Sequence, residues 1–262
     1  MIGFIEKTGD YFLSIIRDLG RMGLFLFSLI RGLFSRPFRF REVVRQLRLI
    51  GADSFWVIFF TGAFTGMVLG LQGYYSLRKF GSEGLLGSAV ALGLIRELGP
   101  VLTALMVTGR AGSAMCAEIG IMRNSEQLDA LECMSIDPFR FLITPKFLAT
   151  MISVPILTQF FSVVGIGGGY FAGVVLLGVN PGAFFSGIEQ SVVNQDINLG
   201  IIKSFVFALL VIWICAGRGY YVHKIRNGGF GAEGVSRATT QAVVMSSISV
   251  LVWDYLITAV ML

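Results

Sequence analysis

The chain contains uncharged apolar stretches that are too long for the core helices of an ordinary soluble domain. Phe55–Leu77 and Phe147–Val179 hold no Asp, Glu, Lys or Arg. About 20 apolar residues cross the hydrocarbon core of a bilayer as a helix. Only 14% of the 262 residues are charged, against about 25% in typical globular domains. We therefore expect an all-α, polytopic membrane protein.

The apolar pattern predicts five transmembrane helices in a single domain that covers residues 1–262, at 55–77, 85–107, 147–179, 199–221 and 242–262. If the N-terminus is cytoplasmic, 17 Lys and Arg residues fall in the cytoplasmic segments 1–50, 108–146 and 217–240. The opposite side then carries only Arg78 and Lys79. Cytoplasmic loops carry the excess of Lys and Arg. We expect a multi-pass protein with a cytoplasmic N-terminus and a periplasmic C-terminus.

Residues 1–50 carry the whole formal net charge of +5. Apolar residues recur there at near-helical spacing between charged ones, namely Phe12, Ile15, Ile16, Leu19, Met22, Phe25, Phe27 and Leu29. This pattern predicts an amphipathic helix in the cytoplasmic interface, attracted to anionic lipids. The alternative is a solvated helix packed on a partner. A nucleic-acid partner is excluded, because no basic patch is interleaved with polar readout residues.

Arg96 and Glu97 interrupt the second expected span, just before Gly99 and Pro100. A charge at the bilayer centre costs about 2.5–3.5 kcal/mol on insertion scales, so each of the two needs a partner or a wet cavity. Pro100 favours a local kink. We expect Arg96 and Glu97 to line a polar pocket. The alternative is a buried pair to other spans, for example to Asp254 or Gln159.

Glycines repeat every four residues on two of the expected spans. Residues four apart share one helix face, which lets another backbone approach closely. The series predict helix-packing seams, formed either inside the chain or as a sliding or homodimer contact, at Gly62, Gly66 and Gly70 and at Gly165, Gly169 and Gly173.

The segment 124–137 is too short to span a bilayer. Asn124 or Ser125 is a candidate helix N-cap, and Asp137 before Pro138 marks the end. The helix would carry an acidic side (Glu126, Asp129, Glu132) and an apolar side (Leu128, Leu131, Met134, Ile136). We expect it to dock a cytoplasmic partner; the alternative is a helix that rests on the membrane surface.

The sequence lacks the residues of common catalytic and metal sites. It has no G-x-x-x-x-G-K-[ST] loop, so we expect no nucleotide hydrolysis by this chain. One histidine, His223, and three scattered cysteines give no metal-ligand cluster. We expect no enzyme activity, no catalytic residue, no metal and no cofactor in this chain.

Three blocks of sequence carry a resemblance to a known family. Gly66–Tyr74 reads GMVLGLQGY, Leu94–Leu131 contains ELGP, GRAG and EQLDAL, and Gly234–Ser247 reads GVSRATTQAVVMSS. These blocks resemble the MlaE family, the membrane permeases of ABC-type phospholipid transporters, and the resemblance covers essentially the whole chain.

The resemblance implies the residue roles and the partners. Arg96 and Glu97 match charged positions of the family's central lipid cavity, and Leu69, Leu77 and Phe80 match positions near its periplasmic mouth. Segment 124–137, with Glu126, Leu128, Asp129 and Glu132, looks like its ATPase-coupling helix.

The implied assembly is a homodimer in the bacterial inner membrane that maintains outer-membrane lipid asymmetry. It is paired with cytoplasmic ATPase subunits, which bind ATP and Mg, and with a periplasmic MCE-domain hexamer. A STAS-domain regulator is often present. Two other functions stay open from the residues alone: an ion-coupled secondary transporter that titrates Glu97, and a non-transporting scaffold held by the glycine seams.

Overall fold

The computed structural model describes residues 2–33, 39–224 and 231–261, and these residues form helices and connecting turns without a strand. Five continuous stretches are long and apolar enough to cross a membrane: Phe40–Arg78, Glu83–Asn124, Phe139–Leu176, Asn194–Tyr220 and Ala232–Met261. The predicted all-α membrane protein with five spans is confirmed.

Each stretch is built from one or more helical elements. The first contains α2 (Phe40–Ile50), the turn η1 (Ala52–Ser54) and α3 (Phe55–Arg78). The second contains η2 (Glu83–Leu85), α4 (Leu86–Gly93), η3 (Leu94–Leu98), α5 (Gly99–Val107), η4 (Thr108–Gly112) and α6 (Ser113–Asn124). The third contains η5 (Phe139–Ile143), α8 (Thr144–Tyr170) and η6 (Phe171–Leu176). The fourth is α10 (Asn194–Tyr220) and the fifth is α11 (Ala232–Met261). The remaining helical elements are α1 (Ile2–Leu33), α7 (Gln127–Cys133), α9 (Pro181–Ser191) and η7 (Val222–Lys224).

Several helical stretches extend beyond the predicted spans. The span predicted at 85–107 continues to Asn124, because the π-helical segment η4 carries it through Arg110 into α6. The span predicted at 55–77 matches α3, and the helical stretch that contains it begins at residue 40; the stretch that contains the span predicted at 242–262 begins at 232. A charged side chain ends an apolar run, but it does not end a helix whose backbone hydrogen bonds continue. The spans predicted at 147–179 and 199–221 correspond to 139–176 and 194–220.

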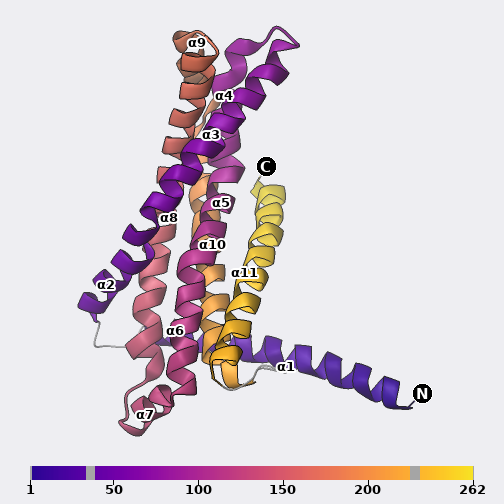
Figure 1. The fold of residues 1–262 in the computed structure, drawn as a ribbon, viewed down its shortest axis with the longest axis vertical. Helices are drawn as coiled ribbons and strands as arrows, with labels where there is room; N and C mark the ends of the chain where they lie inside the picture. The colour runs from indigo at the N-terminus through magenta and orange to yellow at the C-terminus, as the bar shows by residue number, and fades with distance from the viewer. Residues whose placement is uncertain (1, 34–38, 225–230, 262) are drawn as a thin grey trace.

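The spans pack as a long bundle, with α7 at one end and α9 at the other (Figure 1). α10 is the most buried span, and it contacts α5, α6, α8 and α11. α3 packs along α8, whereas α11 leaves most of its surface exposed. The broad apolar faces of α3 and α11 suit a lipid or protein environment better than water.

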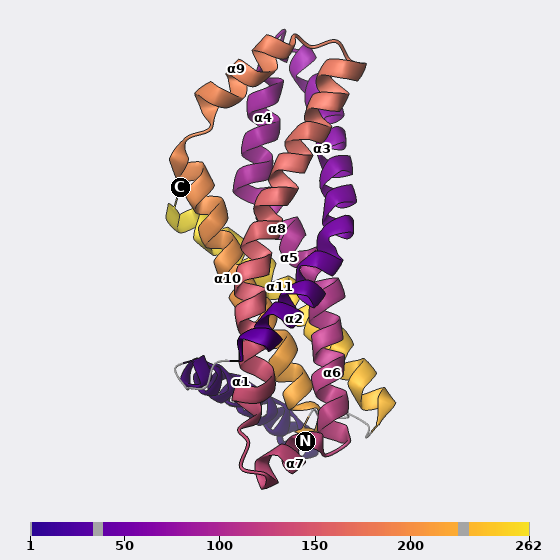
Figure 2. The same ribbon diagram turned by 90° about the vertical axis from the view of Figure 1, so that its left-hand side faces the viewer.

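α1 lies across the end of the bundle that carries α7 and does not run along the spans (Figures 1 and 2). Phe25 and Leu29 are fully buried, and the Trp213 indole N–H donates to the Met22 carbonyl at 2.8 Å. Leu24, like Leu19 and Phe27, is about two-thirds exposed. α1 therefore has the form expected of an interfacial helix. The side chains of Phe12 and Ile15, and residues 34–38 of the predicted 1–50 region, lie outside the described residues.

Candidate functional site: a charge cluster between three spans

Arg96 and Glu97 lie on the π-helical segment η3, in which backbone hydrogen bonds join residues five apart in place of four. The Gly99 N–H donates to the Leu94 carbonyl, five residues back. This wider turn accommodates Pro100, which cannot donate a backbone hydrogen bond. A Cβ on Gly99 would lie 2.5 Å from both the Leu94 carbonyl oxygen and the Ser162 hydroxyl, so the turn needs glycine. π-Helical turns of this kind occur often at functional sites.

Glu97 belongs to an ion cluster that joins three spans. Its Oε2 lies 2.6 Å from Nζ of Lys203 on α10, and the same Nζ lies 2.8 Å from Oδ1 of Asp254 on α11. The Thr258 hydroxyl lies 3.1 Å from Glu97 Oε1. Lys203 is fully buried, so its charge is compensated by the two carboxylates around it.

Arg96 points to a different partner. Its Nη2 and Nε lie 2.7 and 2.8 Å from Oδ1 of Asp196, at the start of α10. The other oxygen of Asp196 accepts the backbone N–H of Val193 at 3.0 Å, which holds the first turn of α10. Neighbours on a helix point in different directions, and each of these two charges accordingly contacts α10 at a separate place.

The cluster is paired but not closed. The side chains of Arg96 and Glu97 stay 32% and 37% exposed, whereas Lys203 is fully buried. Among the described residues, three carboxylates (Glu97, Asp196, Asp254) meet two cations. Both interpretations of Arg96 and Glu97 therefore hold in part. The two charges pair with other spans, Glu97 being linked to Asp254 through Lys203, and both side chains still present polar surface. Gln159 makes no hydrogen bond to Arg96 or Glu97.

The expected mouth residues lie on or just after α3, on a different span from Arg96 and Glu97. Leu69 and Leu77 lie on α3 and pack against the main hydrophobic core. Phe80 follows the end of α3 and is 82% exposed. Arg96 sits deeper along the second span than the α3 terminus. The grouping of these apolar residues with Arg96 and Glu97 stays a prediction.

The two glycine series form packing seams inside the chain. A Cβ on Gly66 would lie 1.8 Å from the carbonyl oxygen of Gly165, and one on Gly70 would lie 2.8 Å from that of Gly169. Gly62 faces the backbone of α8 in the same way. The series on the third span faces α4 and the start of η3, because Cβ atoms there would meet Leu86 at Gly173, Val90 at Gly169 and Leu94 at Gly165. The faces are thus occupied within one copy of the chain.

The helix that the structure forms within the segment 124–137 is shorter than predicted. Asn124 is the last residue of α6, and α7 covers only Gln127–Cys133. The prediction of Asn124 or Ser125 as N-cap is wrong: Glu126 holds that position with φ of 57°. A left-handed residue interrupts the right-handed helical backbone, so α6 and α7 are two separate helices.

α7 presents acidic side chains outward and is anchored by its apolar side. Glu126 and Glu132 are exposed, and Leu128 is fully buried in the main core. Asp129 lies 2.8 Å from the Arg123 guanidinium on α6. Leu128 therefore holds α7 in place rather than offering itself to a partner.

Arg123 also connects α7 to the interfacial helix. Its guanidinium lies 5.5 Å from the Tyr220 ring, which lies 5.8 Å from the Phe25 ring on α1. Arg123 Nε donates to Nδ1 of His223 at 3.3 Å. Burial, and then the charges of Arg123 and Lys224, lower the pKa of His223 below its ordinary value. The ring is therefore neutral at pH 7 and can accept this bond.

Two members of the charge cluster were missed from the sequence. Lys203 lies near the start of the expected span 199–221, and Asp196 lies just before it. The signal that could have found them is simple: an ionisable residue in or beside an apolar span needs a partner on another span. Within the described residues, no group of three His, Cys, Asp or Glu is placed to hold a metal ion.

Ionisable groups paired across several apolar spans are typical of substrate and ion pathways in membrane transport proteins. The fold and this cluster therefore define a multi-pass permease. A family model for the permease MlaE matches residues 43–260, and the chain belongs to the MlaE permease family.

Relatives align along nearly the whole chain. The intermembrane phospholipid transport system permease protein MlaE of Haemophilus influenzae is 44% identical, over 100% of this chain and 98% of its own length. A probable ABC transporter permease protein of Rickettsia bellii is 38% identical, over 98% and 97%. The chloroplastic protein TRIGALACTOSYLDIACYLGLYCEROL 1 of Arabidopsis thaliana is 32% identical, over 84% and 61%.

Proposed function

We propose that this chain is the permease subunit of an ABC transporter that moves phospholipids between the bacterial inner membrane and a periplasmic lipid-binding partner. Such transport would maintain the lipid asymmetry of the outer membrane. The full-length similarity to the Haemophilus influenzae phospholipid transport permease supports this function. Neither an ion-coupled transporter nor a scaffold has comparable support.

The partial exposure of the charge cluster is the observation that carries the lipid-binding role. Arg96 uses two of its five N–H donors on Asp196, and its side chain is 32% exposed. The remaining donors suit a phosphate group, which guanidinium binds in a bidentate manner. In this proposal Arg96 contacts the lipid phosphate, and Glu97 with Lys203 holds the second span against α10 next to Arg96. Leu69, Leu77 and Phe80 contact acyl chains nearer the periplasm.

The orientation follows from the distribution of charge. The basic helix α1 and α7 lie at the same end of the bundle (Figure 1). The segments 1–50, 108–146 and 217–240 hold 17 Lys and Arg residues, and the segments between the other span ends hold two, which by the positive-inside rule supports a cytoplasmic position for this end. α9 and the C-terminus then face the periplasm.

The partners follow from what the chain lacks and from what α7 exposes. With no P-loop in the sequence, ATP and Mg would be bound by a separate cytoplasmic ATPase. Glu126 and Glu132 on α7 would meet basic residues of that ATPase, since interface charges fix register and partner choice. We further propose a homodimer, a periplasmic MCE-domain hexamer and a STAS-domain regulator.

Charge reversal on α7 tests the coupling role. Glu126→Lys combined with Glu132→Lys should release the ATPase from the purified complex while membrane insertion stays normal. Glu189→Lys is the matched control, because it reverses the charge of an exposed glutamate on α9, at the opposite end of the bundle. Full ATPase retention in the double variant would contradict the coupling role. Proton-driven uptake by this chain alone would contradict the ABC mechanism.

A further inference from the structure

A polar groove runs between α2 and α6, away from the charge cluster at Arg96. α2 packs along α8 and stands off from α6. One cavity of about 270 Å³ lies between them, and a second of about 230 Å³ adjoins it. The two share Gln46, Leu49 and Glu118 as lining residues, so they form one continuous groove.

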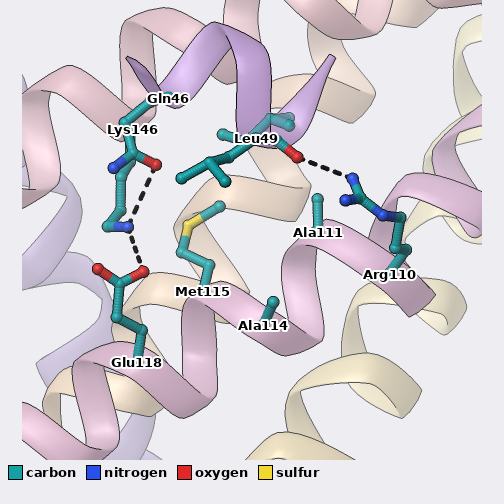
Figure 3. Close-up of a pocket in the computed structure, with 9 residues that line it drawn as sticks. Gln46, Leu49, Arg110, Ala111, Ala114, Met115, Glu118 and Lys146 are labelled. Atoms are coloured by element: carbon teal, nitrogen blue, oxygen red, sulfur yellow. Dashed lines mark hydrogen bonds and ion pairs between the residues drawn. The ribbon is translucent and has the colours of Figure 1, made fainter. Parts of the chain in front are cut away.

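The inner part of the groove has charged ends and an apolar floor (Figure 3). Lys146 and Glu118 lie at one end, and Arg110 lies at the other. The floor between them is one face of the second span, formed by Ala111, Ala114 and Met115. Small residues there leave the volume that larger side chains would fill.

Lys146 is a buried cation that keeps hydrogen-bonding capacity. Its side chain is 1% exposed and lines the cavity. Nζ lies 2.6 Å from Glu118 Oε2 and 3.3 Å from Gln46 Oε1. An ammonium group has three N–H donors. Among the described residues, no third acceptor lies within hydrogen-bond distance of Lys146 Nζ. The third donor is therefore available to an anion in the groove.

Arg110 fixes the far end of the groove. Its guanidinium lies 2.7 Å from the Leu49 carbonyl oxygen, 2.8 Å from the Ser54 hydroxyl and 3.2 Å from a carboxylate oxygen of Asp53. These partners directly precede the uncharged run that starts at Phe55. The groove thus begins where the apolar part of the first span ends, at the level of lipid head groups.

The mouth of the groove is basic. Arg39 and Arg45 line the outer cavity, together with Glu42 and Glu118. Arg45 is 71% exposed on its side chain. Four cations (Arg39, Arg45, Arg110 and Lys146) line the two cavities and meet three carboxylates, Glu42 and Glu118 in the lining and Asp53 beside Arg110, so the groove keeps a positive excess. A phosphate with an apolar glyceride attached matches this pattern of cations beside an apolar floor.

We propose that the groove between α2 and α6 is a second phospholipid site, which takes the phosphate-bearing head group of a lipid from the adjacent leaflet. The phosphate accepts the third N–H of Lys146 and the guanidinium of Arg45. The glyceride lies on Leu49, Ala114 and Met115. In the proposed orientation the leaflet is the cytoplasmic one, and this assignment rests on the proposed function.

Hydrogen exchange of α2 tests the site. The full chain is purified in a maltoside detergent, which contains no phosphate, and dihexanoylphosphatidylglycerol is added. Amide exchange across residues 40–50 should slow as the lipid binds. In the Lys146→Met/Glu118→Gln variant, half-saturation should need about tenfold more lipid, as expected for loss of a charge-assisted hydrogen bond. This double variant removes both charges of the pair and leaves no buried charge unpaired.

Two further variants complete the test. Lys79→Met is the matched control, because it removes a lysine charge at the other end of α3 and should leave the protection of α2 unchanged. Arg45→Gln changes an exposed side chain that folding does not need, and it should also weaken protection. Equal protection by inorganic phosphate would overturn the lipid assignment in favour of a simple anion site. Unchanged half-saturation in the Lys146 and Arg45 variants would overturn the site itself.

The outcome is separable from that of the proposed function. A complex that transfers phospholipid but shows no protection of α2 refutes the groove alone. A protected α2 in a complex that transfers no phospholipid refutes the proposed function and leaves the groove as a lipid site.

Discussion

Lys203 is the residue whose removal should most weaken the fold. It is fully buried and lies 2.6 Å from Glu97 and 2.8 Å from Asp254. Lys203→Met keeps most of the side-chain volume but leaves two carboxylates facing each other without the shared cation. Breaking a buried ion pair from one side costs about 3–5 kcal/mol. Glu97 is 37% exposed, so solvent relieves part of the repulsion and we expect about 3 kcal/mol.

That loss is a large share of a typical stability of about 5–15 kcal/mol. The measurement is denaturant or thermal unfolding of the purified protein, followed by helical signal. The control is Glu97→Gln/Lys203→Met/Asp254→Asn, which has no uncompensated charge and should recover most of the stability. A Lys203→Met protein as stable as wild type, or a triple variant as unstable as the single one, would refute the account of the cluster.

Three other perturbations probe the glycine seam between α3 and α8, the contact of Trp213 with α1, and the protonation of His223. Gly66→Ala should destabilise the protein by forcing α3 away from the α8 backbone, seen as a lower melting temperature; Gly93→Ala, with open space at its Cβ, should not. Trp213→Phe removes the N–H that binds the Met22 carbonyl, costs about 1 kcal/mol, and should speed amide exchange in α1. The pKa of His223 is lowered in the folded protein, so its contribution to stability is present above about pH 6.5 and is lost as the pH falls below that. His223→Asn should remove this acid sensitivity of unfolding.

The number of spans follows from the sequence because long apolar runs have few alternatives in water or lipid. Phe55–Leu77 is an example, since its uncharged length exceeds that of a normal core helix. The ends of the spans are less predictable. Arg110 ends the apolar pattern, yet its side chain finds acceptors on the first span and the helix continues. Side-chain partners far away in the sequence decide such cases, and periodicity does not report them.

The sequence predicts two members of the charge cluster but not their partners. Arg96 and Glu97 stand out because they interrupt an apolar span. Their partners Lys203 and Asp196 lie a hundred residues later, and only the packing of α10 against the second span brings them together. Likewise the start of α7 depends on the left-handed backbone at Glu126, a conformation that residues other than glycine seldom adopt.

The central claim is that a partly open charge cluster handles phospholipid. The most direct measurement is the phospholipid phosphorus bound per purified complex, together with ATP-driven lipid transfer, for wild type and Arg96→Gln. Asp196→Asn is the control, because it breaks the same ion pair with the buried position 196 but keeps the Arg96 guanidinium, so it reports how much lipid and transfer are lost through stability alone. The account predicts less bound phospholipid and slower transfer by Arg96→Gln. Normal lipid content and normal transfer in a folded Arg96→Gln complex would contradict it.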